Sequence, residues 1–154
     1  LHDHMSLEFV NVGIVFGCLG MITGMIWASG TWGKPWSNDP KQIGAGLCLL
    51  TYFAYLVLRN SIQNKKNVAT ISAVYNVFAF ALIIPLLFIV PARFESLHPA
   101  SGESNPLEAL YTQASAFRKV SLPAMFGWVM LGIWIFNVRI RTKKLELSKK
   151  WKDQ

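Results

Sequence analysis

Four long apolar runs constrain this chain more than any other feature of its sequence. They cover Leu7–Ala28, Ile43–Leu58, Ala69–Val90 and Val120–Val138. A helix needs roughly 17–25 apolar residues to cross a bilayer, and a helix satisfies all its backbone groups there. The second run is the shortest, but Lys41 and Arg59 at its ends can extend to the lipid headgroups. The sequence therefore predicts an all-α fold: a single integral membrane domain over residues 1–154, a bundle with four transmembrane helices.

Charge is scarce and is placed at the ends of these runs. The chain is 53% hydrophobic and 15% charged, with a net charge of +7. Basic residues gather at Arg59, Lys65 and Lys66 and again in a tail over residues 139–154. Because basic residues near span ends favour the cytoplasm, the tail, and with it the C-terminus, is predicted to be cytoplasmic. The loop after the first run and the segment Pro91–Lys119 are then extracytoplasmic. Anionic headgroups of the lipid bilayer account for the net charge, and no nucleic acid partner is expected.

Two features inside the runs predict packing rather than chemistry. Gly13, Gly17, Gly20 and Gly24 share one helical face, which predicts a close approach to another helix. Pro85 in the third run is expected to kink its helix or leave one carbonyl without a partner. Neither a close carboxylate pair nor a Ser/His/Asp arrangement is evident, so no catalytic residues are assigned and no enzyme is predicted.

The loop over Thr31–Lys41, with the sequence TWGKPWSNDPK, is the strongest functional signal. Flat aromatic surfaces beside fixed polar groups suit a planar, mostly apolar ligand with a polar edge, and haem is the obvious candidate. The iron would need an imidazole, and His98 is the histidine expected on the same face. Candidates for the ring faces and the propionates are Trp27, Trp32, Trp36, Lys34, Lys41, Arg93 and Asn38.

Each of these residues also has a structural interpretation. A tryptophan at the end of a span is commonly an interfacial anchor, most plainly for Trp27. A lone loop histidine such as His98 is more often solvated than bound to metal. Asp39, followed by Pro40, could simply cap the second helix. The residues alone leave both interpretations open.

In combination, the motifs resemble a known family. The run W-G-x-x-W-x-x-D at Trp32, Gly33, Trp36 and Asp39 resembles the tryptophan-rich WWD signature of the haem-handling membrane proteins of cytochrome c maturation. The resemblance is greatest to the branch called protein C, or haem exporter protein C. It extends through the segments YLVLRNSI, ISAVYNVFAF and PARFESLHP, which leads into His98.

This resemblance implies a function and a set of site residues. Members have six spans in the bacterial inner membrane and bind haem b transiently at the outer face. They deliver it to a membrane-anchored haem chaperone, aided by ABC transporter subunits and a small single-span partner. On the resemblance, His98 matches the second of two axial histidine ligands of the haem iron. The cofactor-binding platform matches Trp32, Gly33, Trp36 and Asp39.

The sequence departs from the family pattern in two ways. Pro35 stands where many members have a tryptophan. The four spans match the family's last four, so the first two spans and the first axial histidine have no counterpart, and His2 and His4 are expected on the other side of the membrane. We therefore expect this chain alone to bind haem weakly, through one protein ligand, or to need the missing part. The alternative is a non-catalytic helical subunit of a membrane transporter or respiratory complex, which would carry no pigment.

Overall fold

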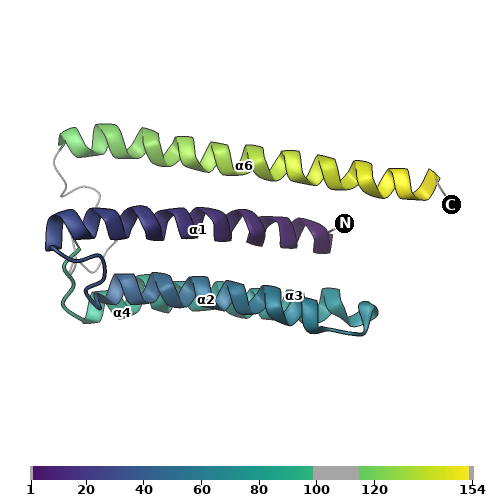
Figure 1. Cartoon of the computed structure of the whole chain (residues 1–154), viewed down its shortest axis with the longest axis horizontal. Helices are drawn as coiled ribbons and strands as arrows, with labels where there is room; N and C mark the ends of the chain where they lie inside the picture. Colours follow the sequence, from purple (N-terminus) through teal and green to yellow (C-terminus); the bar gives the residue numbers. More distant parts are fainter. Residues whose placement is uncertain (1, 99–114, 153–154) are drawn as a thin grey trace. The chain divides into compact units, whose positions relative to one another are not determined.

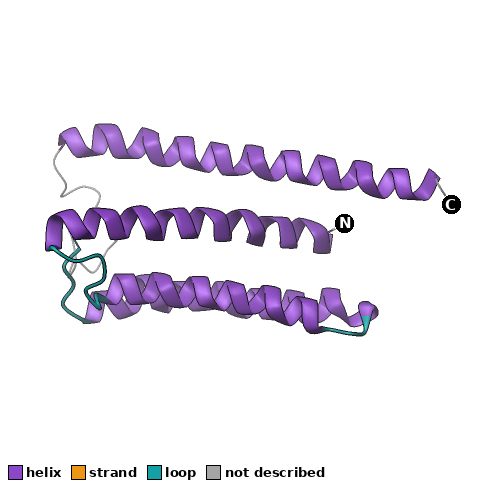
Figure 2. Ribbon diagram, viewed as in Figure 1, coloured by secondary structure: helices purple, strands orange, loops and turns teal. Residues whose placement is uncertain are grey.

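Helices account for nearly all of the structure, a computed structural model that describes residues 2–98 and 115–152. The elements are α1 (His2–Trp32), α2 (Pro40–Ser61), α3 (Lys65–Ile84), the π-helical turn η1 (Pro85–Ile89), α4 (Val90–Arg93) and α6 (Ser115–Lys152) (Figure 1). Figure 2 shows loops but no strand among the described residues. The predicted all-α fold is confirmed.

Four helical stretches are long and apolar enough to cross a membrane, and each contains one of the four predicted runs. They are His2–Trp32, Pro40–Ser61, Lys66–Arg93 and Arg118–Glu146. Many of their large apolar side chains are exposed, as expected for surfaces that face lipid. The chain is therefore a multi-pass membrane protein. Helix α6 continues into the predicted basic tail as far as Lys152, whereas residues 99–114 of the predicted outer segment lie outside the described residues.

The described residues form two compact units. The terminal unit comprises residues 2–13 and 115–152, and the central unit comprises residues 14–98. In the terminal unit, the ring of Phe9 stacks on that of Phe136, with centroids 3.7 Å apart. The carboxylate of Glu8 pairs with the guanidinium of Arg139. These two contacts join the start of α1 to α6.

In the central unit, α2 and α3 form an antiparallel hairpin. Asp39 caps α2, with Pro40 in its first turn, and the Asn64 side chain caps α3 by accepting a hydrogen bond from the Lys66 N–H. Such caps satisfy backbone donors that a helix leaves unpaired at its start. Across the hairpin, the Tyr75 hydroxyl donates to the Thr51 carbonyl over 3.1 Å. The hairpin returns the chain to the end at which α2 began.

The predicted disturbance at Pro85 is a π-helical turn. Proline cannot donate a backbone hydrogen bond, and the Val90 N–H donates to the Pro85 carbonyl across the wider turn of η1. The backbone of η1 lies very close to α2 here. A Cβ atom added to Gly44 would lie 2.1 Å from the carbonyl oxygen of Leu86. The absence of a side chain at Gly44 is therefore what allows this approach.

The glycine stripe of the first span shows a contact of this kind at one position. A Cβ atom on Gly17 would lie 2.6 Å from the Leu49 side chain of α2, whereas one on Gly13, Gly20 or Gly24 would meet no described atom within 4 Å. At Gly17 a side chain of α2 thus occupies the space that glycine leaves, and the close approach predicted for the stripe as a whole stays a prediction.

Candidate functional site

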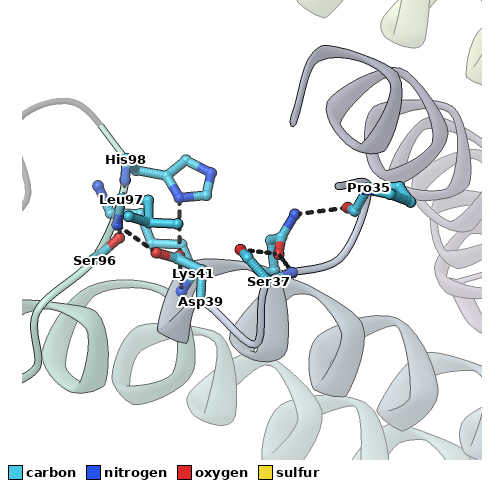
Figure 3. Close-up of polar contacts among 8 residues, drawn as sticks. Pro35, Ser37, Asp39, Lys41, Ser96, Leu97 and His98 are labelled. Carbon is cyan, nitrogen blue, oxygen red and sulfur yellow. Dashed lines mark hydrogen bonds and ion pairs between the residues drawn. The ribbon is translucent and has the colours of Figure 1, made fainter. Parts of the chain in front are cut away.

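Three segments meet at one end of the central unit: the end of α1, the loop over residues 33–39, and the segment 94–98 that follows α4. Helix α2 leads away from this end, and α3, η1 and α4 lead back to it. Figure 3 shows the result, in which Asp39 and His98 face each other although 59 positions separate them. The Nδ1 atom of His98 lies 2.9 Å from Oδ1 of Asp39.

The carboxylate of Asp39 is the centre of this arrangement. Its Oδ1 also accepts a hydrogen bond from the Lys41 N–H (2.9 Å), and its Oδ2 accepts one from the Leu97 N–H (2.6 Å). Asp39 as a residue is only 3% exposed. One buried side chain therefore caps α2 and also holds the segment that carries His98.

Asp39 is ionised at neutral pH. Burial raises the pKa of its carboxyl. Hydrogen bonds from the Ser96 side chain and from the Leu97 and Lys41 N–H groups, together with electrostatic attraction to His98, lower the pKa by a larger amount, so the net shift is downward. An ionised carboxylate only accepts hydrogen bonds. The Nδ1 atom of His98 must therefore carry the proton that it shares with Asp39.

The imidazole of His98 is partly exposed and lies beside two indoles. Its side chain is 29% exposed, and its ring meets that of Trp32 edge to face, with centroids 4.9 Å apart. Trp32 in turn meets Trp27 edge to face at 5.1 Å. In Figure 3 the second ring nitrogen of His98, Nε2, points away from Asp39. Trp27 thus belongs to an aromatic cluster, whether or not it also anchors the span end.

A buried glutamine that sequence reasoning missed holds the loop over residues 33–39. Oε1 of Gln42 accepts hydrogen bonds from both the N–H and the hydroxyl of Ser37 (3.0 Å each), and its Nε2 donates to the Pro35 carbonyl (3.1 Å). Gln42 is 7% exposed. Its signal in the sequence is an uncharged polar side chain in the first turn of an apolar span, where an unpartnered amide would be costly.

Two residues of the loop adopt the left-handed backbone region, Gly33 (φ 76°) and Asn38 (φ 56°), which are residue types that tolerate it. Asn38 also accepts a hydrogen bond from the indole N–H of Trp36 over 2.7 Å. The ring of Trp36 lies close to α2, 3.6 Å from where a Cβ on Gly46 would be. Of the predicted site residues, Trp32, Asp39 and His98 are therefore brought together, Gly33 shapes the turn, and Trp36 makes a separate set of contacts.

We expect Gln42→Leu to loosen this loop, because the substitution leaves Ser37 and Pro35 without their partner. Each such hydrogen bond contributes about 0.5–1.5 kcal/mol, so amide exchange at Ser37 should accelerate by about tenfold or more. Hydrogen-exchange mass spectrometry of the detergent-solubilised protein measures this. Gln63→Leu, at an exposed glutamine in the α2–α3 connection, is the matched control. Unchanged exchange in the Gln42 variant would show that the loop does not depend on it.

The donor set fits an axial ligand to haem iron. Metal-bound histidines typically donate their other ring N–H to a carboxylate or carbonyl, which fixes the ring. His98 has that carboxylate in Asp39, and indole rings flank its imidazole. The fold and site therefore define a multi-pass membrane protein with a histidine–tryptophan site at one end of a helical unit.

Comparison with known proteins identifies the family. The family described as cytochrome C assembly protein matches residues 1–98, which include the whole site, and the chain belongs to this family. The family expected from the motifs is confirmed, and membership connects the chain with cytochrome c biogenesis. No solved structure matches the chain.

The curated relatives carry the name cytochrome c biogenesis protein CcsA. That of Synechococcus sp. (strain CC9311) is 43% identical over 61 residues, which is 40% of this chain and 20% of the relative. Those of Synechococcus sp. (strain RCC307) and Prochlorococcus marinus (strain MIT 9303) are each 42% identical over 59 residues, 38% of this chain and 19% of the relative. The matched stretch thus spans about a fifth of the length of these relatives.

Proposed function

We propose that this chain binds haem at the end of the central unit and presents it for delivery during cytochrome c biogenesis. The observation that carries the proposal is the pairing of the His98 imidazole with a buried carboxylate, beside the ring of Trp32. Family membership supplies the process, and the site supplies a ligand and an aromatic surface. Haem b is the transient cargo.

Each residue of the site has a role in this proposal. His98 binds the iron through Nε2, since its Nδ1 is held by Asp39. Trp32 contributes aromatic surface beside the iron ligand, and Trp36 and Gly33 shape the rest of the platform. Lys34, in the loop over residues 33–39, and Arg93, at the end of α4, are exposed. Their positive charges attract the haem propionates, and Lys41 and Asn38 are further hydrogen-bond donors.

The site faces the outside of the bacterial inner membrane in this proposal. It lies at the end of the central unit opposite the α2–α3 connection, where Arg59 and Lys66 stand. Basic residues at span ends favour the cytoplasm, and this arrangement supports an extracytoplasmic site. The partners proposed are a membrane-anchored haem chaperone, ABC transporter subunits and a small single-span protein. The chaperone takes the haem by exchanging its own ligand for His98.

An absorption spectrum of the detergent-purified protein, from cells replete in haem, tests the proposal. A Soret band in the isolated protein is the expected result. A preparation without pigment would contradict haem binding and would favour a non-catalytic helical subunit of a transporter or respiratory complex.

Trp32→Ala is expected to lower haem content more than Trp36→Ala, because Trp32 contacts the imidazole ring while Trp36 lies against α2. An aromatic contact contributes about 0.5–1.5 kcal/mol beyond burial, which corresponds to a loss of up to about tenfold in affinity. Haem per protein is measured as the pyridine haemochrome, and circular dichroism should show an intact bundle. Trp134→Ala, at an exposed position of α6, is the control. Equal haem content in all three variants would remove Trp32 from the site.

A further inference from the structure

We infer that Asp39 acts on haem through His98, as a positioning residue, rather than by touching the porphyrin. Its carboxylate fixes both the orientation of the imidazole and the nitrogen that is presented to the iron. The inference rests on the proposed function and adds to it the part that the acidic residue of the W-G-x-x-W-x-x-D run plays.

Asp39 has little capacity left for a ligand. Its side chain is 1% exposed. Oδ1 accepts from the Lys41 N–H and from the His98 ring, and Oδ2 accepts from the Leu97 N–H. A haem propionate is also an anion and would be repelled by this carboxylate rather than bound. Direct contact with the haem is therefore disfavoured by access and by charge.

The same contacts control His98 closely. The carboxylate holds the ring at Nδ1 and holds the preceding backbone at the Leu97 N–H, so that the residue is fixed at two points. The His98 N–H donates to the Ser96 hydroxyl as well, which closes the turn around the carboxylate. Because the proton lies on Nδ1, the lone pair lies on Nε2. A carboxylate partner also makes an imidazole a more basic ligand.

A purely structural role, as the cap of α2, is the competing explanation. Asp39→Asn separates the two. Asparagine caps a helix about as well as aspartate, so α2 should keep its start. The capping oxygen is the one that faces His98, so the amide nitrogen takes the place of Oδ2, where it meets the Leu97 N–H donor to donor. The segment that carries His98 then loses one anchor, and the His98 ring N–H keeps only an uncharged oxygen as its partner. Asn64→Ala is the matched control, because the Asn64 side chain caps α3 in the same way, by accepting a hydrogen bond from the N–H of Lys66, two residues later (3.1 Å).

Haem affinity, midpoint potential and the nitrogen NMR signals of His98 are measured for the wild-type chain, Asp39→Asn, His98→Ala, the double variant and Asn64→Ala. Loss of the hydrogen-bond partner of a metal-bound histidine typically costs about 10–100-fold in metal affinity, and we expect a loss of that size in Asp39→Asn. Its residual haem should show a raised midpoint potential, since a less basic imidazole stabilises ferric iron less. The double variant should bind no worse than His98→Ala, and Asn64→Ala should match the wild type.

Two results would overturn the inference. Asp39→Asn with wild-type affinity and potential would leave Asp39 as a cap only. A double variant that binds haem more weakly than His98→Ala would show that Asp39 contacts haem independently. Failure of the proposed function is recognised separately, as a wild-type chain that binds no haem. In that case the haem-free protein tests the role of Asp39, and nitrogen NMR signals of His98 that stay unchanged in Asp39→Asn would refute it.

Discussion

Replacing His98 by alanine is expected to abolish the Soret band of the purified protein, or to shift it to that of haem without a histidine ligand. Imidazole is a common metal ligand, and that of His98 is both partly exposed and oriented by a buried carboxylate. Without it, apolar contact with the indoles alone must retain the haem. Absorption spectra and haem per protein, measured side by side with the wild type, are the test.

Two controls make the His98 result specific. His4→Ala changes a histidine of the terminal unit and should keep the full band. Adding imidazole to the His98→Ala protein should restore a histidine-like spectrum, because the free ligand can occupy the vacated space. A band of wild-type intensity and position in His98→Ala would refute this histidine as the ligand, whatever the effect of the tryptophan variants.

The fold could be predicted from the sequence because transmembrane helices depend on length and hydropathy, which are local properties. The predicted ends of the spans were less accurate than their number and order. The second run, Ile43–Leu58, lies within a helix that extends from Pro40 to Ser61, because the cap at Asp39 and the long side chains of Lys41 and Arg59 carry the helix past its apolar stretch. An apolar run marks only the lipid-facing part of a span, and the extension is indicated instead by the capping residue and the flanking basic side chains.

The site was predicted in part. Trp32, Gly33, Asp39 and His98 stand out by residue type and by the motif, and the side chains of Trp32, Asp39 and His98 do meet at one end of the central unit. Their pairing could not be predicted, because it joins positions 59 apart through the return of α3, η1 and α4. The sequence left Asp39 open between capping and function. Its two oxygens serve the cap and the histidine together.

The most consequential glycine was also hidden from sequence reasoning. The regular stripe in the first span attracts notice, yet the tightest backbone approach is at Gly44 in the second. It depends on the π-helical turn that begins at Pro85, which directs the Leu86 carbonyl toward α2. A contact of this kind requires the three-dimensional path of two helices and leaves no periodic trace.

Gly44→Ala is expected to be strongly destabilising, although a glycine-to-alanine change inside a helix ordinarily stabilises by about 0.5–1 kcal/mol. The added Cβ would lie 2.1 Å from the Leu86 oxygen and 3.0 Å from its carbonyl carbon, so the backbones of α2 and η1 must separate. Overpacking costs about 1–3 kcal/mol in cores that can adjust, and a backbone contact cannot be relieved by a rotamer change. Thermal unfolding in detergent should therefore occur several degrees lower.

The same substitution should impair haem binding at a distance, because the two helices that separate carry the two halves of the site. Asp39 stands at the start of α2, and His98 follows η1 and α4. An open apolar pocket of about 250 Å³ lies between α2 and the segment formed by η1 and α4, lined by Pro40, Ile43, Gly44, Leu47, Leu86, Val90 and Phe94. Gly20→Ala, where an added Cβ meets no described atom within 4 Å, should be neutral or stabilising with full pigment. If both variants unfold at the wild-type temperature and keep their haem, the close approach of α2 and η1 does not hold the site together.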